Sequence, residues 1–109
     1  MAEPRIRTQD ERGESTDDRS TEWLLQAIAE LDTRKDSFLI VGWVADGSGN
    51  TFVQLFSDQK GSYTLEYRYG GPDSHFRAEG ADLATAQRIV TEWAAGKTGW
   101  GDNVPWRKL

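Results

Sequence analysis

The chain has 109 residues, and 13 Lys and Arg against 18 Asp and Glu give it a formal net charge of −5. This length corresponds to one domain. The absence of cysteine excludes disulfides, thiolate metal sites and a cysteine nucleophile. The acidic balance disfavours nucleic acid as a partner, because surfaces that follow the phosphate backbone need clustered Lys and Arg.

The sequence contains no run of about 18 apolar residues, and its N-terminus lacks the basic-then-apolar order of a secretion signal. We therefore expect no membrane partner and a cytoplasmic location.

Residues 1–20 are expected to form a disordered tail. Ile6 is the only large aliphatic residue in this segment after the initiator Met, so burial cannot offset the entropy cost of ordering it. Residues 21–109 are then expected to form a single α+β domain.

The first regular element predicted is an amphipathic helix that begins near residue 21. Ser20 or Thr21 suits the N-cap, and the polar stretch 32–36 ends the helix. Its apolar residues fall at helical spacing: Trp23, Leu24, Ala27, Ile28 and Leu31.

The middle of the chain has strand patterns. Residues 38–44 form a continuous apolar run, 51–56 a second strand and 62–69 a third with clean alternation, while His75–Ala78 is a candidate fourth. The connections between them are short, which favours an antiparallel meander of three or four strands. Their turns are placed at residues 46–50, 58–61 and 70–73.

A second helix is predicted between Asp82, its N-cap, and Gly96, its C-terminal stop. Trp100 and Trp106 follow, and we expect this tail to pack back on the domain. The predicted fold is therefore α+β, with an N-terminal helix, a three- to four-stranded antiparallel meander and a C-terminal helix packed on one sheet face.

Motifs for cofactors are absent from the sequence. Gly96, Lys97 and Thr98 lack the upstream glycine of a phosphate-binding loop, because position 91 is threonine. The turn at residues 46–50 lacks the alternating acids of a calcium loop, and a single histidine without cysteine disfavours zinc. We expect no cofactor and no metal.

The aromatic content is high, with five Trp, four Phe and three Tyr. Two interpretations stand: the helices cover the tyrosine face of the third strand, or that face binds a partner protein or a second copy of the chain. The candidate interaction residues are Tyr63, Tyr67, Tyr69, Trp100 and Trp106.

His75, Arg77 and Glu66 form the one cluster suited to acid–base chemistry, with histidine as base, arginine as clamp and carboxylate as orienter. Arg68 lies on the same strand face as Glu66. The alternative function is accordingly a small enzyme or ligand-binding domain, which a deep concavity joining these side chains would favour. Cross-strand ion pairing is the simpler interpretation.

The segments Glu-Tyr-Arg (66–68), Gly-Pro-Asp (71–73) and His-Phe-Arg (75–77), with the Trp-rich end, resemble small uncharacterised α+β proteins of high-GC actinobacteria. This likeness covers residues 38–106. The closing order of a helix, Ala-Gly and a late Trp is similar, more distantly, to immunity proteins of bacterial polymorphic toxin systems. That resemblance implies a non-enzymatic, acidic inhibitor that captures a basic, nucleic-acid-processing toxin.

Overall fold

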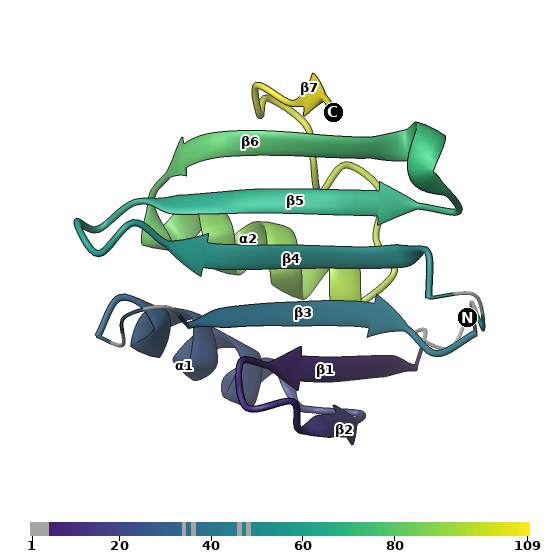
Figure 1. Ribbon diagram of the computed structural model, residues 1–109, viewed down its shortest axis with the longest axis horizontal. Helices are drawn as coiled ribbons and strands as arrows, with labels where there is room; N and C mark the ends of the chain where they lie inside the picture. Colours follow the sequence, from purple (N-terminus) through teal and green to yellow (C-terminus); the bar gives the residue numbers. More distant parts are fainter. Residues whose placement is uncertain (1–4, 34, 36, 46, 48) are drawn as a thin grey trace.

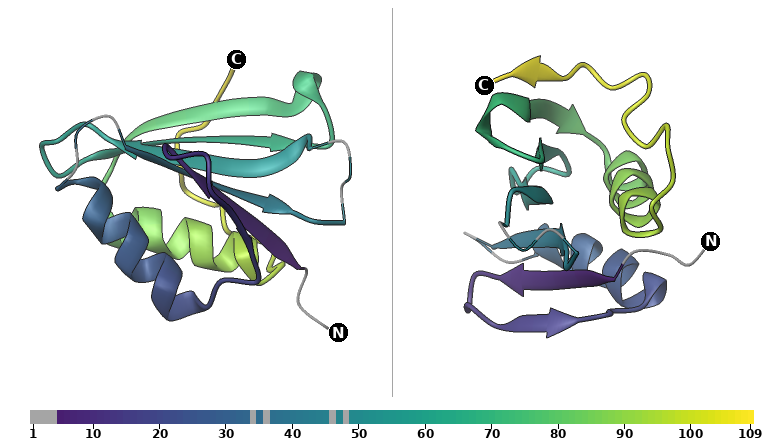
Figure 2. Two further views of the ribbon diagram at one scale, coloured as in Figure 1. Left: turned by 60° about the horizontal axis from the view of Figure 1, so that its bottom comes forward. Right: turned by 90° about the vertical axis from the view of Figure 1, so that its right-hand side faces the viewer.

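The computed structural model describes residues 5–33, 35, 37–45, 47 and 49–109, and within them all strands join one antiparallel sheet (Figure 1). Both α-helices lie on the same face of this sheet (Figure 2). The strand order is β2-β1-β3-β4-β5-β6-β7. The strands are β1 (Ile6–Asp10), β2 (Ser15–Asp17), β3 (Phe38–Trp43), β4 (Thr51–Ser57), β5 (Tyr63–Tyr69), β6 (His75–Ala81) and β7 (Arg107–Lys108). The α+β class and the antiparallel pairing are confirmed.

The N-terminal segment departs from the prediction, because residues expected to be a tail form β1 and β2. β1 lies between β2 and β3, with Ile6 opposite Trp43 and Thr8 opposite Val41. Ile6 and Thr8 are buried beneath the helix layer, whereas Arg7 faces outward. Apolar burial alone does not order this segment, and backbone pairing of β1 with β2 and β3 supplies the missing stabilisation. Within the described residues, two strands therefore precede the first helix.

The predicted meander is present as β3 to β6, and its fourth strand is longer than expected. The expectation of three or four strands is wrong, because β1, β2 and β7 extend this meander on both sides. The helix-facing positions alternate along each strand and build the core. They include Leu39, Val41, Val53, Leu55, Tyr63 and Leu65.

Helix α1 (Thr21–Leu31) begins where predicted. The Ser20 side chain accepts a hydrogen bond from the Trp23 backbone N–H at 3.1 Å. Near its C-terminus the Tyr63 hydroxyl donates to the carbonyl of Ile28 at 3.1 Å, and so satisfies a carbonyl of the last turn. This bond ties the end of α1 to the start of β5. Arg34 and Asp36, in the polar stretch that follows, lie outside the described residues.

Helix α2 (Leu83–Ala94) also has its predicted cap. The Asp82 carboxylate accepts from the Thr85 backbone N–H at 2.8 Å, and hydrogen bonds from Thr85 lower the pKa of Asp82. The helix buries Ala86, Ile89, Val90 and Trp93. Gly96 follows with φ of +72°, a conformation that favours glycine. A 3₁₀ turn (Pro72–Ser74) replaces the simple turn expected before β6. In the turn at residues 46–50, Asp46 and Ser48 lie outside the described residues.

Leu31→Ala is expected to lower the free energy of unfolding by about 2–5 kcal/mol, because Leu31 is 1% exposed and its loss leaves a cavity. Leu109→Ala removes the same atoms at a site that is 53% exposed and is expected to change stability by less than about 0.5 kcal/mol. Urea denaturation of both variants checks this. Equal losses for both variants would contradict the buried position of Leu31.

The stability of the fold is expected to fall above pH 10. Burial, together with the nearby charge of Asp32, raises the pKa of the Tyr63 phenol above its ordinary value of 10. The folded chain thus keeps this proton at a pH where the unfolded chain releases it, so the contribution is present below pH 10 and lost as the pH rises further. Tyr63→Phe should flatten this decline, while costing about 1 kcal/mol at neutral pH through the lost hydrogen bond. Urea denaturation between pH 8 and 11 measures both effects, and Tyr69→Phe, which removes an exposed hydroxyl, is the control.

Candidate functional site

A cluster of aromatic rings joins the C-terminal part of α2 to the ends of β3 and β5. At its centre is Trp93, which is fully buried. The Trp93 ring stacks on Trp43 with centroids 5.0 Å apart and meets Tyr69 and Trp100 edge to face at 5.9 and 5.0 Å. The Trp43 indole N–H donates to the backbone carbonyl of Trp93 at 3.2 Å. The indole N–H of Trp93 has no acceptor in the described part of the chain, so packing alone holds this ring.

The rings of Tyr67, Trp100 and Trp106 continue this cluster toward the C-terminus. Tyr67 meets each tryptophan edge to face at 4.8 Å and stacks on Phe76 at 5.0 Å. Burial raises the pKa of the Tyr67 phenol. The tail therefore packs back on the domain, as the sequence predicts.

These rings line an open groove with a volume of about 390 Å³. Its second wall is the loop at residues 96–102, which carries three glycines. The Trp106 indole N–H donates to the carbonyl of Gly101 at 3.1 Å, and a Cβ at Gly101 would stand 2.9 Å from that indole nitrogen. Glycine at this position therefore lets the loop lie against Trp106. The side chains in the groove wall are Trp43, Tyr67, Tyr69, Lys97, Thr98, Trp100, Asp102 and Trp106.

Four of the five predicted interaction residues meet in this aromatic groove, and the fifth does not. Tyr63 is 2% exposed at the opposite end of β5, beneath α1, so the helix layer covers that end of the tyrosine face. Tyr69 remains 51% exposed. Trp43 was not among the predicted interaction residues, although strand alternation places it on the same face as Val41, which pairs through Val53 with Tyr67.

The polar residues Glu66, Arg68, His75 and Arg77 gather on the sheet face opposite the helices. Their strands pair Glu66 with Arg77 and Arg68 with His75. Arg77 donates to one oxygen of Glu66 at 2.6 and 3.2 Å, and His75 Nε2 lies 3.0 Å from the other oxygen. The hydrogen bond and charge of Glu66 raise the pKa of Arg77.

Both ring nitrogens of His75 and both carboxylate oxygens of Glu66 have partners in this network, whereas Arg68 Nε is buried and has none in the described part of the chain. Arg68 Nη2 lies 3.3 Å from His75 Nδ1. Because a guanidinium donates only, Nδ1 is the acceptor, and the proton of a neutral His75 lies on Nε2 and is donated to Glu66. Neither imidazole nitrogen is left for a substrate. None of the four side chains lines the aromatic groove or the other principal hollows of the described residues, so the deep concavity that would favour an enzyme is not seen at this cluster.

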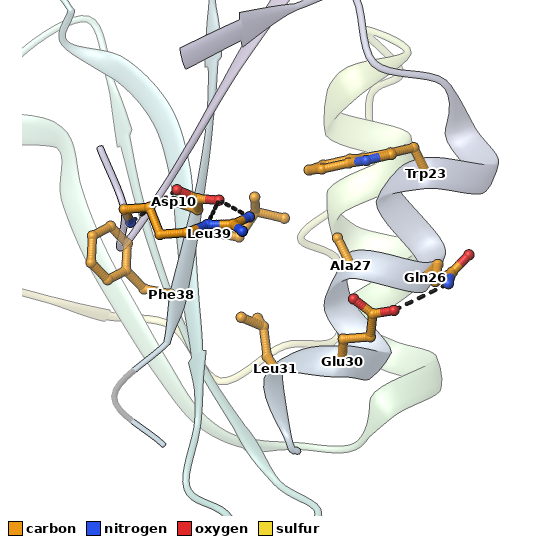
Figure 3. A pocket seen from close by; sticks show the side chains of 9 residues that line it. Asp10, Trp23, Gln26, Ala27, Glu30, Leu31, Phe38 and Leu39 are labelled. Carbon is orange, nitrogen blue, oxygen red and sulfur yellow. Dashed lines mark hydrogen bonds and ion pairs between the residues drawn. The ribbon is translucent and has the colours of Figure 1, made fainter. Parts of the chain in front are cut away.

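Another hollow lies between α1 and the part of the sheet where β1 ends and β3 begins (Figure 3). Its volume is about 310 Å³, and Trp23 and Leu39 face each other across it. No residue of this hollow was a candidate in the sequence analysis, which treated Trp23 as core.

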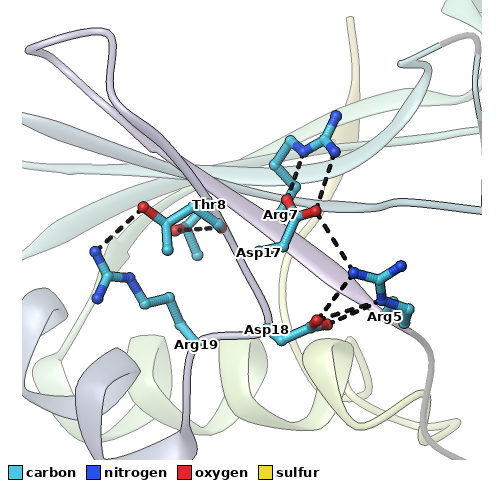
Figure 4. Close-up of polar contacts among 7 residues, drawn as sticks. Arg5, Arg7, Thr8, Asp17, Asp18 and Arg19 are labelled. Carbon is cyan, nitrogen blue, oxygen red and sulfur yellow. Dashed lines mark hydrogen bonds and ion pairs between the residues drawn. The ribbon is translucent and has the colours of Figure 1, made fainter.

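Ion pairs at the N-terminal edge hold β1 and β2 together (Figure 4). Arg7 contacts Asp17 at 2.6 and 3.1 Å across the two strands, and Arg5 contacts Asp18 at 3.0 Å. The hydrogen bond from Arg7 lowers the pKa of Asp17. These groups are solvent-exposed, so they specify strand pairing more than they stabilise the fold.

Within the described residues, no group of three or more His, Asp or Glu side chains is placed to hold a metal ion. None of the helices described is both long and apolar enough to cross a membrane. Comparison with known proteins finds no match: no family model, no curated protein and no solved structure is similar to the chain.

Proposed function

We propose that this chain is a non-enzymatic, cytoplasmic protein-interaction domain that binds a basic partner protein through the aromatic groove. The observation that carries the proposal is the convergence of Trp43, Tyr67, Tyr69, Trp100 and Trp106 on one open groove. Tryptophan and tyrosine dominate the binding energy of protein interfaces, because each buries a large area with few rotatable bonds.

The contacts among the groove rings support this function, since they fix the rings before a partner arrives. Trp93 braces Trp43, Tyr69 and Trp100 from below, and Tyr67 braces Trp100 and Trp106. Rings already held in place lose little conformational freedom on binding, which leaves more of the contact energy for affinity.

The charge of the chain indicates the class of partner. A net charge of −5 accelerates encounter with a basic protein and slows encounter with an acidic one. The resemblance to immunity proteins fits the same chemistry, with a basic, nucleic-acid-processing toxin as the partner. A second copy of the chain carries the same negative charge and is the less favoured partner.

The alternative function, a small enzyme or ligand-binding domain built on His75, Arg77 and Glu66, receives less support. The three side chains share one sheet face, as that function requires, yet their hydrogen bonds go to one another. A general base needs a free nitrogen within reach of its substrate. We therefore assign this network to the cohesion of β5 and β6.

Tyr69→Ala is expected to weaken partner capture at least tenfold, because Tyr69 presents the most exposed ring of the groove. The measurement is a pull-down from a lysate of the source organism with the tagged chain, followed by titration calorimetry with the recovered protein. The recovered protein should be basic, and its binding should weaken as salt rises. Leu83→Ala removes an exposed apolar side chain on α2, outside the groove, and is the matched control. Equal capture by both variants would refute the groove as the binding surface.

Glu66→Gln is expected to lower the free energy of unfolding by about 1–2 kcal/mol, because two charge-assisted hydrogen bonds from Arg77 lose their charged acceptor. Partner capture should stay at the wild-type level, since Glu66 faces away from the groove. Urea denaturation and the same calorimetric titration check the two effects. Loss of capture in a stably folded Glu66→Gln chain would instead place the binding surface on the open sheet face.

A further inference from the structure

The hollow beside α1 is lined by apolar side chains together with polar and charged ones, among them the exposed carboxylate of Glu30 (Figure 3). Trp23, Ala27 and Leu31 approach it from α1, and Phe38 and Leu39 contribute from β3. At about 310 Å³ it reaches the lower end of the size range of small-ligand pockets. It shares no lining residue with the aromatic groove, so it is a separate site.

Three charged side chains line the hollow, and two of them form an ion pair with each other. Asp10 and Arg12 neutralise each other: the Asp10 carboxylate is 13% exposed and accepts from the Arg12 side chain at 2.8 and 3.1 Å. Burial opposes ionisation of Asp10, but the hydrogen bonds from Arg12 outweigh it and lower its pKa. Glu30 accepts a hydrogen bond from neutral Gln26 at 3.1 Å, and no cation of the described chain forms an ion pair with it. The lining therefore carries one excess negative charge.

The position of Trp23 adds a geometric requirement. The Arg19 guanidinium carbon lies 4.3 Å from the Trp23 ring centre, so a cation already covers one face of the indole. An aromatic ring, rather than a second cation, suits the face directed into the hollow. Glu30 is seven residues further along α1, which puts its backbone about 10 Å away along the helix axis.

We propose that this hollow binds an arylalkylammonium ion, with its ring against Trp23 and its ammonium group at Glu30. Offset stacking and burial of the apolar linker against Ala27, Leu31 and Leu39 supply the attraction. The charge of Glu30 selects a cation over an anion. A spacer of about four carbons between ring and nitrogen matches the separation along the helix. This inference does not depend on the proposed function.

The test is a titration of the full-length chain with 4-phenylbutylammonium chloride, followed by amide and indole NMR shifts. We expect saturable shifts at the Trp23 indole and at Ala27, with the groove indoles of Trp100 and Trp106 unmoved. 4-Phenylbutyrate has the same ring and spacer with the opposite charge, and should bind at least tenfold more weakly. Absence of saturable shifts at millimolar ligand, or equal affinity for the two compounds, would overturn the proposal.

Two matched variants test whether the charge of Glu30 is needed for binding, and a third tests whether the ligand occupies the hollow. Glu30→Gln should weaken 4-phenylbutylammonium binding about fivefold, whereas Glu22→Gln, an equal change of charge on an exposed residue of α1 outside the hollow, should leave it unchanged. Ala27→Leu should fill the hollow and abolish binding while the remaining spectrum keeps its dispersion. Equal effects of the two Glu variants, or wild-type binding by Ala27→Leu, would refute the site.

Discussion

The burial of Trp93 is the interaction on which the C-terminal half of the molecule depends. Its ring stands between the end of β3, the end of β5 and the tail that follows α2, and it contacts Trp43, Tyr69 and Trp100. A helix, two strands and an irregular segment thus share one side chain. Together with the hydrogen bond from Trp106 to Gly101, this anchor holds the glycine-rich loop at residues 96–102, whose own backbone is permissive. The groove is therefore a consequence of core packing. It lies where the rings beyond Trp93 are not covered by other parts of the described chain.

The two faces of the sheet are held by different kinds of interaction. The helix-covered face supplies the apolar core, from Leu39 and Val53 to Leu65. On the other face, half-buried polar side chains hydrogen-bond to one another, and Glu66 accepts from Arg77 and contacts His75. Such a network gives register specificity to β5 and β6, because a shift by one residue would leave the carboxylate without donors. Strand pairing therefore accounts for the contacts that Glu66, His75 and Arg77 make with one another.

Much of the central fold could be predicted because local sequence patterns specify its helices and strands. Helical spacing located α1 and α2, and alternation located β5 with its tyrosines on one face. The N-terminal strands could not be predicted in this way: β1 contains one large apolar residue, and its stabilisation comes from pairing with β3, more than thirty residues away in the chain. Similarly, Tyr63 and Tyr69 share a face, but what covers that face depends on helix placement. Alternation therefore gave no means of separating the buried tyrosine from the exposed one.

The strand order also constrains how the chain folds. β1 lies between β2 and β3, although the whole of α1 separates these two strands in sequence. β1 thus completes its hydrogen bonding only after a long loop has closed, whereas β4 and β5 pair only with the strands next to them in the sequence. Closing that loop costs entropy before any contact repays it, so local pairing in the meander is expected to precede docking of the N-terminal hairpin. The same hairpin forms the rim of the hollow beside α1, which places that hollow in the part of the molecule expected to open first in native-state hydrogen exchange.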